Sequence, residues 1–337
     1  MSGKVVKNMV VDEYLREYKK TPSLTLAKKI YKDNPALFTS IETCRCAVRY
    51  RRGASGERDR EKAKKKYAEF FRPISFNNTN PFNLPEPEVD DYVPYALPTT
   101  CTNILHIQDF HIPYHCNKTI GLALEYGRNK DVNTVLFGYD FMDMYSMSRF
   151  IKDPRKRNFS YERDTAIKVI EAMKRALPKA KFFFRTGNHD DRYEQYMHVK
   201  APELLDCKEF ELKNILRLHD YDITCLAPKQ IVKAGKLNII HGNEYGGANS
   251  SSVNPARGIF IRALNNTMVG HSHRSSEHIE SDINGNIFGT VSLGCACQLH
   301  PEYARLNKWN NGFAHILVNK DKSYHVNNMK VIGYKIV

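Results

Sequence analysis

The sequence lacks any hydrophobic run near the ~20 residues that a helix needs to cross a bilayer. Its first residues also lack the apolar core of a secretory signal peptide, because Lys4 and Lys7 interrupt them. We therefore expect a cytoplasmic protein without a membrane partner. Hydrophobic residues make up 42% and charged residues 26% of the 337 positions, a balance that excludes a disordered or fibrous chain.

The cysteines lack the C-x-x-C spacing that is typical of zinc sites. The chain has eight of them, which are Cys44, Cys46, Cys101, Cys116, Cys207, Cys225, Cys295 and Cys297. A chain of this length can build its own core without disulfides, so we expect reduced thiols that behave as small buried residues. No internal repeat of the length found in solenoid proteins is present.

Positive charge is concentrated near the N-terminus. The whole chain carries 51 basic and 37 acidic residues, a net charge of +14. Residues 1–75 contain 19 Lys and Arg against 9 Asp and Glu, so they hold +10, and the remaining residues hold +4. A compact basic segment favours a polyanionic partner, nucleic acid first; a solubilising charged surface is the alternative.

Residues 1–75 have the pattern of a small all-α domain. Thr39 or Ser40 can cap a third helix that runs to Arg52 and stops at Gly53. On that helix the apolar residues Ile41, Cys44 and Val48 share one face, and Arg45, Arg49 and Arg52 share another. This arrangement resembles the recognition helix of a helix-turn-helix domain, and the three arginines are the candidate nucleic-acid contacts. Small helical modules that bind protein share the same pattern.

The rest of the chain divides into a linker and an α/β body. Residues 76–100 are rich in Pro, Asn and acidic residues, which predicts a linker without regular structure. Residues 101–337 alternate apolar strands with helices and end in strand hairpins. The expected strands are 104–108, 132–137, 181–185, 237–240, 267–269, 278–283, 287–293, 313–318 and 324–336, and the expected helices are 118–128, 161–177 and 255–264.

Five short polar motifs follow apolar strands of this body. Their sequences, in chain order, are Asp109-Phe110-His111, Asp140-Phe141-Met142-Asp143, Gly187-Asn188-His189-Asp190, His241-Gly242 and Gly270-His271-Ser272-His273. In α/β folds such strand ends gather at one edge of a sheet, where ligands bind. The mixture of carboxylate, imidazole and amide groups suits divalent transition metals.

This ordered set resembles the calcineurin-like metallophosphoesterase superfamily, whose pattern is DxH, GDxxD, GNH(D/E), a lone His and GHxH. The resemblance covers roughly residues 103–335 and implies a four-layer α/β/β/α sandwich with mixed sheets. One position departs from the pattern. Tyr139 stands where the family has the glycine of GDxxD, and Gly138 lies one residue earlier. This difference affects the expected backbone conformation before Asp140 more than the expectation that Asp140 binds metal.

The resemblance implies two divalent metal ions. Asp109, His111 and His273 would hold one ion, Asn188, His241 and His271 would hold the other, and Asp140 would bridge them. Manganese is the expected metal, with iron, zinc and nickel as alternatives. The resemblance also implies that a bridging hydroxide attacks the ester, that His189 serves the leaving oxygen, and that Asp143 holds the His189 ring.

The expected activity is a phosphodiesterase or nuclease that acts on nucleic acid, in particular DNA. Methionine and tyrosine follow Asp143, so the arginine of the protein-phosphatase subgroup is absent, and the basic domain favours a nucleic-acid substrate. The alternatives are a phosphomonoesterase acting on proteins or nucleotides, and a DNA-binding protein with an inactive metal site. Phage and mobile-element chains resemble this architecture, so the expected cytoplasm is that of a bacterial or phage-infected cell.

The arginine face gives a first prediction. If residues 1–75 bind DNA, affinity should fall steeply with salt, because basic side chains displace counterions from phosphates. The double substitution Arg45→Ala with Arg49→Ala should weaken binding, as measured by titration of labelled DNA at several salt concentrations. DNA binding that is unchanged in this double variant would contradict the recognition-helix interpretation.

Overall fold

The computed structural model describes residues 3–54, 61, 80, 82–85, 88, 92–151, 153, 155, 158–245 and 253–337. The chain divides into two compact units, residues 1–88 and residues 89–337. The boundaries predicted from composition, at 75 and 100, stay predictions. The basic run between the helical residues and the linker lies almost wholly outside the described residues.

The first unit is a cluster of three helices: α1 (Gly3–Glu17), α2 (Ser23–Asp33) and α3 (Ile41–Arg51). Ser40 caps α3 in a capping box. Its hydroxyl accepts a hydrogen bond from the Thr43 backbone N–H, and the Thr43 hydroxyl accepts one from the Ser40 backbone N–H. A small core fills the space between the helices, with Leu26 and Ile30 from α2 and Cys44 and Val48 from α3 all fully buried. The helices of this region are therefore as expected, while its helix-turn-helix function stays a prediction.

The second unit contains two mixed β-sheets. The strands are β1 (Tyr95–Ala96), β2 (Asn103–Gln108), β3 (Thr134–Gly138), β4 (Lys181–Arg185), β5 (Ile223–Cys225), β6 (Val232–Ala234), β7 (Leu237–Ile239), β8 (Thr267–Val269), β9 (Ser276–Ser281), β10 (Ile287–Ser292), β11 (Asn311–Val318), β12 (Tyr324–Ile332) and β13 (Lys335–Ile336). One sheet has the order β1-β6-β7-β8-β10-β9, and the other has the order β13-β12-β11-β2-β3-β4-β5. In the second sheet β2, β3, β4 and β5 run parallel, so their carboxyl ends meet at one edge.

The sheets pack face to face because their strands are apolar on both sides. In β2, β3 and β4 the residues Ile104, Leu136 and Phe183 contact the six-stranded sheet through a shared buried core. Their neighbours, such as Phe137 and Phe184, form a second core on the opposite face. Alternation of side chains along a strand requires this division when both faces are covered.

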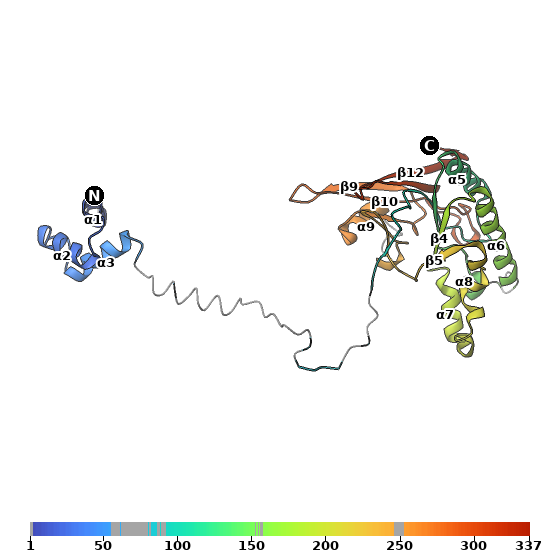
Figure 1. Ribbon diagram of the computed structural model, residues 1–337, viewed down its shortest axis with the longest axis horizontal. Coiled ribbons are helices and arrows are strands. Elements are labelled where there is room, and N and C mark those ends of the chain that lie inside the picture. The colour runs from blue at the N-terminus through green and yellow to red at the C-terminus, as the bar shows by residue number, and fades with distance from the viewer. Residues whose placement is uncertain are drawn as a thin grey trace. The chain divides into compact units, whose positions relative to one another are not determined.

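Helices cover both outer faces. The helices of this unit are α5 (Asn117–Asn129), α6 (Phe159–Ala176), α7 (Asp191–Lys200), α8 (Leu212–Ile215) and α9 (Pro255–Ala263). Helices α5 and α6 lie along the seven-stranded sheet, and α9 packs on the other sheet through Ile259 and Val269 (Figure 1). The expected four-layer α/β/β/α sandwich with mixed sheets is confirmed.

Two expectations about single elements need correction. The segment expected to be an irregular linker contains β1, because Tyr95 and Leu97 donate backbone hydrogen bonds to β6 between Pro94 and Pro98. Proline is compatible with this position because β1 is an edge strand. The single strand expected over 324–336 is divided into β12 and β13 by a turn at Gly333, which has a φ of +56°.

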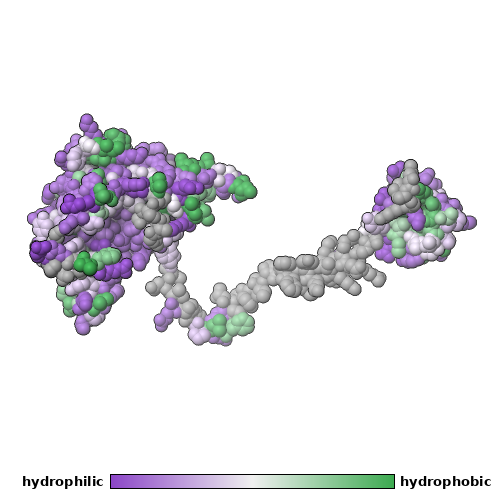
Figure 2. All heavy atoms as spheres, turned by 180° about the vertical axis from the view of Figure 1, so that it is seen from behind, coloured by the Kyte–Doolittle hydropathy of each residue, from purple (hydrophilic) through white to green (hydrophobic). Residues whose placement is uncertain are grey.

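Among the described residues, no helix is long and apolar enough to cross a membrane. On the face shown in Figure 2, hydrophilic residues dominate the larger unit, and hydrophobic residues gather in separate small groups. This distribution matches a surface that meets water over most of its area.

A buried carboxyl group ties α6 to the loop after β3. Glu162 is only 4% exposed, and its Oε1 accepts a hydrogen bond from the Met144 backbone at 2.5 Å. Met144 itself has a left-handed φ of +52°. Burial raises the pKa of Glu162 from its ordinary 4.5 to about 8, and the charges of Asp143 and Asp190 add to this effect.

The raised pKa makes stability depend on pH. The folded state keeps a proton that the unfolded state releases above pH 4.5, so Glu162 lowers stability as pH rises from 4.5 to 8. In metal-free protein, Glu162→Gln should therefore stabilise the second unit at pH 7.5 by roughly 3 kcal/mol more than at pH 5. Thermal melts at both pH values test this. Glu125→Gln, an exposed change on α5, should show no such difference, and equal shifts for Glu162→Gln at both pH values would contradict it.

Candidate metal centre

Two groups of potential ligands meet where the strand-end loops converge. Asp109, His111 and His273 form one group, and Asp140, His241 and His271 form the other. Within each group the ligand atoms lie within 4.8 Å of one another. Asn188 belongs beside the second group, since its Oδ1 lies 3.0 Å from the Nε2 atom of His241. All seven side chains predicted as ligands are therefore brought together, and their ligand role stays a prediction.

Asp140 stands between the two groups. Its Oδ2 lies 3.1 Å from Nε2 of His241 and 3.9 Å from Nε2 of His111. Burial alone would lower the pKa of His241, but the Asp140 charge and hydrogen bond outweigh it and raise that pKa to about 9. Burial and the His241 charge lower the pKa of His271 to about 4. These distances place Asp140 beside both groups, and its bridging role stays a prediction.

The loops that carry these side chains have strained backbones. Five of the seven predicted ligands have positive φ, with values of 54° at Asp109, 47° at His111, 74° at Asp140, 61° at His271 and 53° at His273. The left-handed conformation costs a residue with a side chain about 1–2 kcal/mol. Such strain gathers at functional sites, where the surrounding structure holds it in place.

Two motif glycines are required by close packing at this centre. A Cβ atom on Gly187 would lie 2.3 Å from Oδ1 of Asp140. A Cβ atom on Gly270 would lie 2.6 Å from Oδ2 of Asp109 and nearer still to Gln108. Any larger residue at either position would displace a carboxylate that belongs to the candidate site.

Asp190, the last residue of the third motif, was given no role from the sequence, yet its carboxylate organises two of the loops. Oδ2 of Asp190 accepts from the backbone nitrogens of Asp140, Phe141 and Gly187 at 3.0, 3.1 and 2.9 Å, and its Oδ1 accepts from Met142 at 2.9 Å. Burial and the Asp140 charge raise the pKa of Asp190 to about 7, against the effect of these four N–H groups. Asp190 thus fixes the loop after β3 to the loop after β4.

Asp143 and His189 meet as expected. Asp143 Oδ1 lies 3.2 Å from Nδ1 of His189 and also 3.2 Å from Nδ1 of His111. The sequence did not indicate this second contact. The charges and hydrogen bonds of the two imidazoles hold the pKa of Asp143 well below its usual range despite its burial. Asp143 therefore orients a predicted ligand and a predicted catalytic residue together.

The other ring nitrogen of His189 faces an arginine. Nη2 of Arg192 lies 2.9 Å from Nε2 of His189, and Nη1 donates to the Asp143 carbonyl at 2.8 Å. A guanidinium only donates, so Nε2 accepts here and the ring proton sits on Nδ1. In this arrangement Arg192, which the sequence did not indicate, is the donor beside the candidate centre. The role of His189 as proton donor stays a prediction.

Tyr139, the departure from the family pattern, is fully buried in the core between the sheets. The Arg185 guanidinium lies over its ring, with Cζ 4.9 Å from the centroid. Arg185 also pairs with Glu244 at 2.6 Å, and Glu244 in turn accepts from the backbone nitrogens of His241 and Gly242. The tyrosine therefore supports the His241 loop from within and does not face the site opening.

A thiol pair and the single tryptophan surround His273. Cys295 and Cys297 are buried, and together with His273 they form a third group whose ligand atoms lie within 4.8 Å. Sγ of Cys297 lies 3.9 Å from Nδ1 of His273. The Trp309 ring packs against His273 with a centroid distance of 4.2 Å. The sequence interpretation treated these cysteines only as core residues and missed their position.

The three arginines predicted to contact nucleic acid, two on α3 and one at its C-cap, have partners within the first unit. Arg45 pairs with Glu42 at 3.1 Å, and Arg49 donates to the Ala54 carbonyl at 3.2 Å. Arg52 donates to the Ser23 hydroxyl at 3.2 Å and lies 3.4 Å from the Tyr18 and Lys19 carbonyls. Arg52 therefore joins the ends of the helices, while nucleic-acid contact by any of the three stays a prediction.

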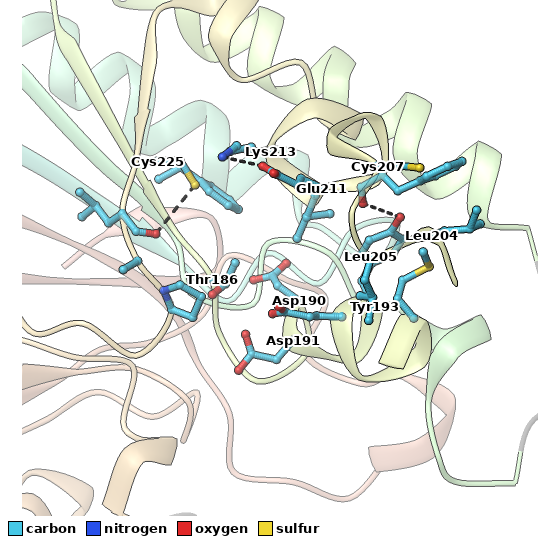
Figure 3. A pocket seen from close by; sticks show the side chains of 18 residues that line it. Thr186, Asp190, Asp191, Tyr193, Leu204, Leu205, Cys207, Glu211, Lys213 and Cys225 are labelled. Carbon is cyan, nitrogen blue, oxygen red and sulfur yellow. Dashed lines mark hydrogen bonds and ion pairs between the residues drawn. The ribbon is translucent and has the colours of Figure 1, made fainter. Parts of the chain in front are cut away.

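A separate cavity has a volume of about 560 Å³, and Figure 3 shows the side chains that line it. Asp190, Asp191 and Thr186 form one side of it, and the Glu211–Lys213 ion pair lies on another. Of the described residues that line it, none is a predicted metal ligand. The predicted ligands therefore lie outside this cavity.

The cluster fits divalent metal ions. Oδ1 of Asp109 is buried and has no hydrogen-bond partner in the described part of the chain. Nε2 of His111 and Nε2 of His273 face each other at 3.1 Å, so they can share one proton at most. A cation would satisfy this oxygen and both nitrogens, and imidazole with carboxylate is a donor set for Mn, Fe, Zn or Ni.

Comparisons with known proteins give phage relatives and distantly similar solved structures. No family model matches the chain. The chain is 26% identical over 176 residues to the Gene 54 protein of Mycobacterium phage D29, covering 51% of this chain and 69% of the relative, and 23% identical over the same length to the Gene 54 protein of Mycobacterium phage L5. Crystal structures of Vps29 from Entamoeba histolytica (a single mutant) and Chaetomium thermophilum share 14% and 13% identity, with TM-scores of 0.36 and 0.32. They match 70% and 68% of this chain and 96% and 97% of their own chains.

The four bonds to Asp190 give a prediction about metal binding. Asp190→Asn keeps the shape of the side chain but replaces one acceptor oxygen with an NH₂ group. The backbone N–H groups that donate to that oxygen then lose their acceptor. We expect manganese affinity, measured by calorimetric titration of metal-free protein, to fall about 10- to 100-fold. Glu194→Gln, an exposed change on the same helix, is the control. Unchanged affinity in Asp190→Asn would show that these loops do not need its carboxylate.

Proposed function

We propose that the protein is a metal-dependent phosphoric ester hydrolase, more narrowly a phosphodiesterase or nuclease acting on nucleic acid in the cytoplasm. The position of Asp140 between the two ligand groups carries this proposal. Two divalent ions supply four positive charges and Asp109 with Asp140 removes two, since the His and Asn ligands are neutral. The remaining two positive charges suit an anionic phosphate ester.

When bound, two metal ions supply a nucleophile at neutral pH and a clamp on both ends of an in-line displacement. The residues of the chain are proposed to hold the two ions in place. Asp109, His111 and His273 are proposed to hold one ion and Asn188, His241 and His271 the other, with Asp140 shared between them. Manganese is the metal that we propose first.

Arg192 and His189 are proposed to serve the ester itself. Arg192 lies against Nε2 of His189, so its guanidinium is near the group proposed to meet the leaving oxygen. A fixed positive charge there would stabilise negative charge that develops on the ester oxygens. Asp143, bonded to both His111 and His189, would keep the two rings in a fixed relation during the reaction.

The first unit supports a nucleic-acid substrate. Its basic residues would attract the sugar-phosphate backbone, and attachment to the same chain would raise the local concentration of phosphodiester at the second unit. A phosphomonoesterase is the second candidate, with the first unit only recruiting it to its substrate.

Hydrolysis of a chromogenic phosphodiester and of the matching monoester, with added manganese, tests the proposal. Diester cleavage should fall at least about 100-fold in Asp140→Asn, which keeps the shape but removes the shared charge. Asp164→Asn, an exposed change on α6, should retain activity. Cleavage of the monoester alone would favour the phosphomonoesterase. If neither ester is cleaved and the purified protein holds no metal, the results favour the alternative of a DNA-binding protein with an inactive metal site.

A further inference from the structure

A surface groove of about 610 Å³ begins at the candidate metal centre and runs along α7. Asn188, one of the predicted ligands, lines its inner end. One wall is formed by the segment Met147–Phe150, which follows the loop of Asp140, and the other wall by α7. Its volume lies in the range of about 300–1,000 Å³ that is usual for ligand sites.

The α7 wall is a single helical stripe. Arg192, Gln195, Tyr196, Val199 and Lys200 all line the groove, and their spacing places them on one face of the helix. The adjacent face carries Tyr193 and Met197, which are buried against the body. From Arg192 to Lys200 the stripe extends about 12 Å along the helix axis, away from the metal centre.

The charge of the groove has one sign. Arg149, Arg192 and Lys200 line it, and none of its ten described lining residues is Asp or Glu. Arg192 lies at the inner end beside His189, and Lys200 lies at the far end of the helix. A row of cations that starts at a phosphoesterase centre suits a chain of phosphate groups better than one isolated phosphate.

Apolar and aromatic surface alternates with these cations. Phe150 is 66% exposed, Val199 is 72% exposed and Tyr196 is 39% exposed, one aromatic on each wall. The Arg149 guanidinium lies over the Phe150 ring, 5.6 Å from its centroid. Large apolar side chains that remain in water at the mouth of a site indicate a partner that covers them.

We propose that this groove binds single-stranded nucleic acid and leads it to the metal centre. The phosphates would meet Arg149, Arg192 and Lys200, and unstacked bases would pack on Phe150 and Tyr196. Proteins that bind single strands combine a basic groove with aromatic stacking surfaces in this way. In a duplex the bases are already stacked on each other and cannot offer their faces to side chains. This inference rests on the proposed function and specifies its substrate class.

Binding of labelled oligo-dT and of a duplex of equal length, in the presence of EDTA, tests the groove. The full-length chain carries Arg45→Ala and Arg49→Ala throughout, so that the predicted contacts of the first unit do not mask the result. Phe150→Ala with Tyr196→Ala should weaken oligo-dT binding at least about tenfold and change duplex binding less than about twofold. Phe150→Tyr with Tyr196→Phe keeps both aromatic faces and should bind oligo-dT like the parent.

The cations are tested by salt dependence. Arg149→Ala with Lys200→Ala should reduce the slope of log K against log salt for oligo-dT by about 1.4, because two phosphate contacts are lost. Lys320→Ala with Lys330→Ala, an exposed pair remote in sequence from the groove, should leave the slope unchanged.

The results separate this inference from the proposed function. Oligo-dT affinity that survives the double alanine substitution at Phe150 and Tyr196, or equal weakening of oligo-dT and duplex, overturns the groove assignment. Aromatic-dependent oligo-dT binding without cleavage of any phosphodiester would support the groove and count against the reaction. Diester cleavage, combined with oligo-dT binding that does not depend on Phe150 and Tyr196, would support the reaction and count against the groove.

Discussion

The hydrogen bonds of the Asp190 carboxylate fix two loops of the candidate metal centre to each other. They join the loop after β3, which carries Asp140, to the loop after β4, which carries Asn188. The parallel order of β2, β3 and β4 brings these loops to one edge, but a sheet alone positions loops only approximately. The left-handed backbone at Asp140 persists because several N–H groups around it are already bonded to a rigid acceptor.

A second support comes from the opposite sheet. His241 follows β7, and the Arg185–Glu244 ion pair fixes its backbone from below. Tyr139 fills the space between the sheets beside this pair. The turn between β3 and Asp140 uses three successive residues with positive φ, with values of 109° at Gly138, 51° at Tyr139 and 74° at Asp140.

Much of the fold and of the candidate site follows from the sequence because the signals are local. Strands such as β3 and β4 are continuous apolar runs, and a polar motif directly after a strand lies at the edge of the sheet. Strands β5 and β6 have only three residues each, too few for a periodic pattern. Helix α7 buries little more than Tyr193 and Met197, so its amphipathic pattern is weak. The roles of Asp190, Arg192 and Glu244 depend on long-range contacts that no motif records.

The two-residue strand β1 has a consequence for how the units can be separated. It pairs with β6, so that a strand of two residues, and not β6, forms this edge of the six-stranded sheet. An uncovered strand edge offers free N–H and C=O groups to other chains and promotes aggregation. The segment that leads out of the first unit thus also protects the second from edge-to-edge association. After proteolysis between the units, the second unit would resist aggregation only if the cut falls before Tyr95.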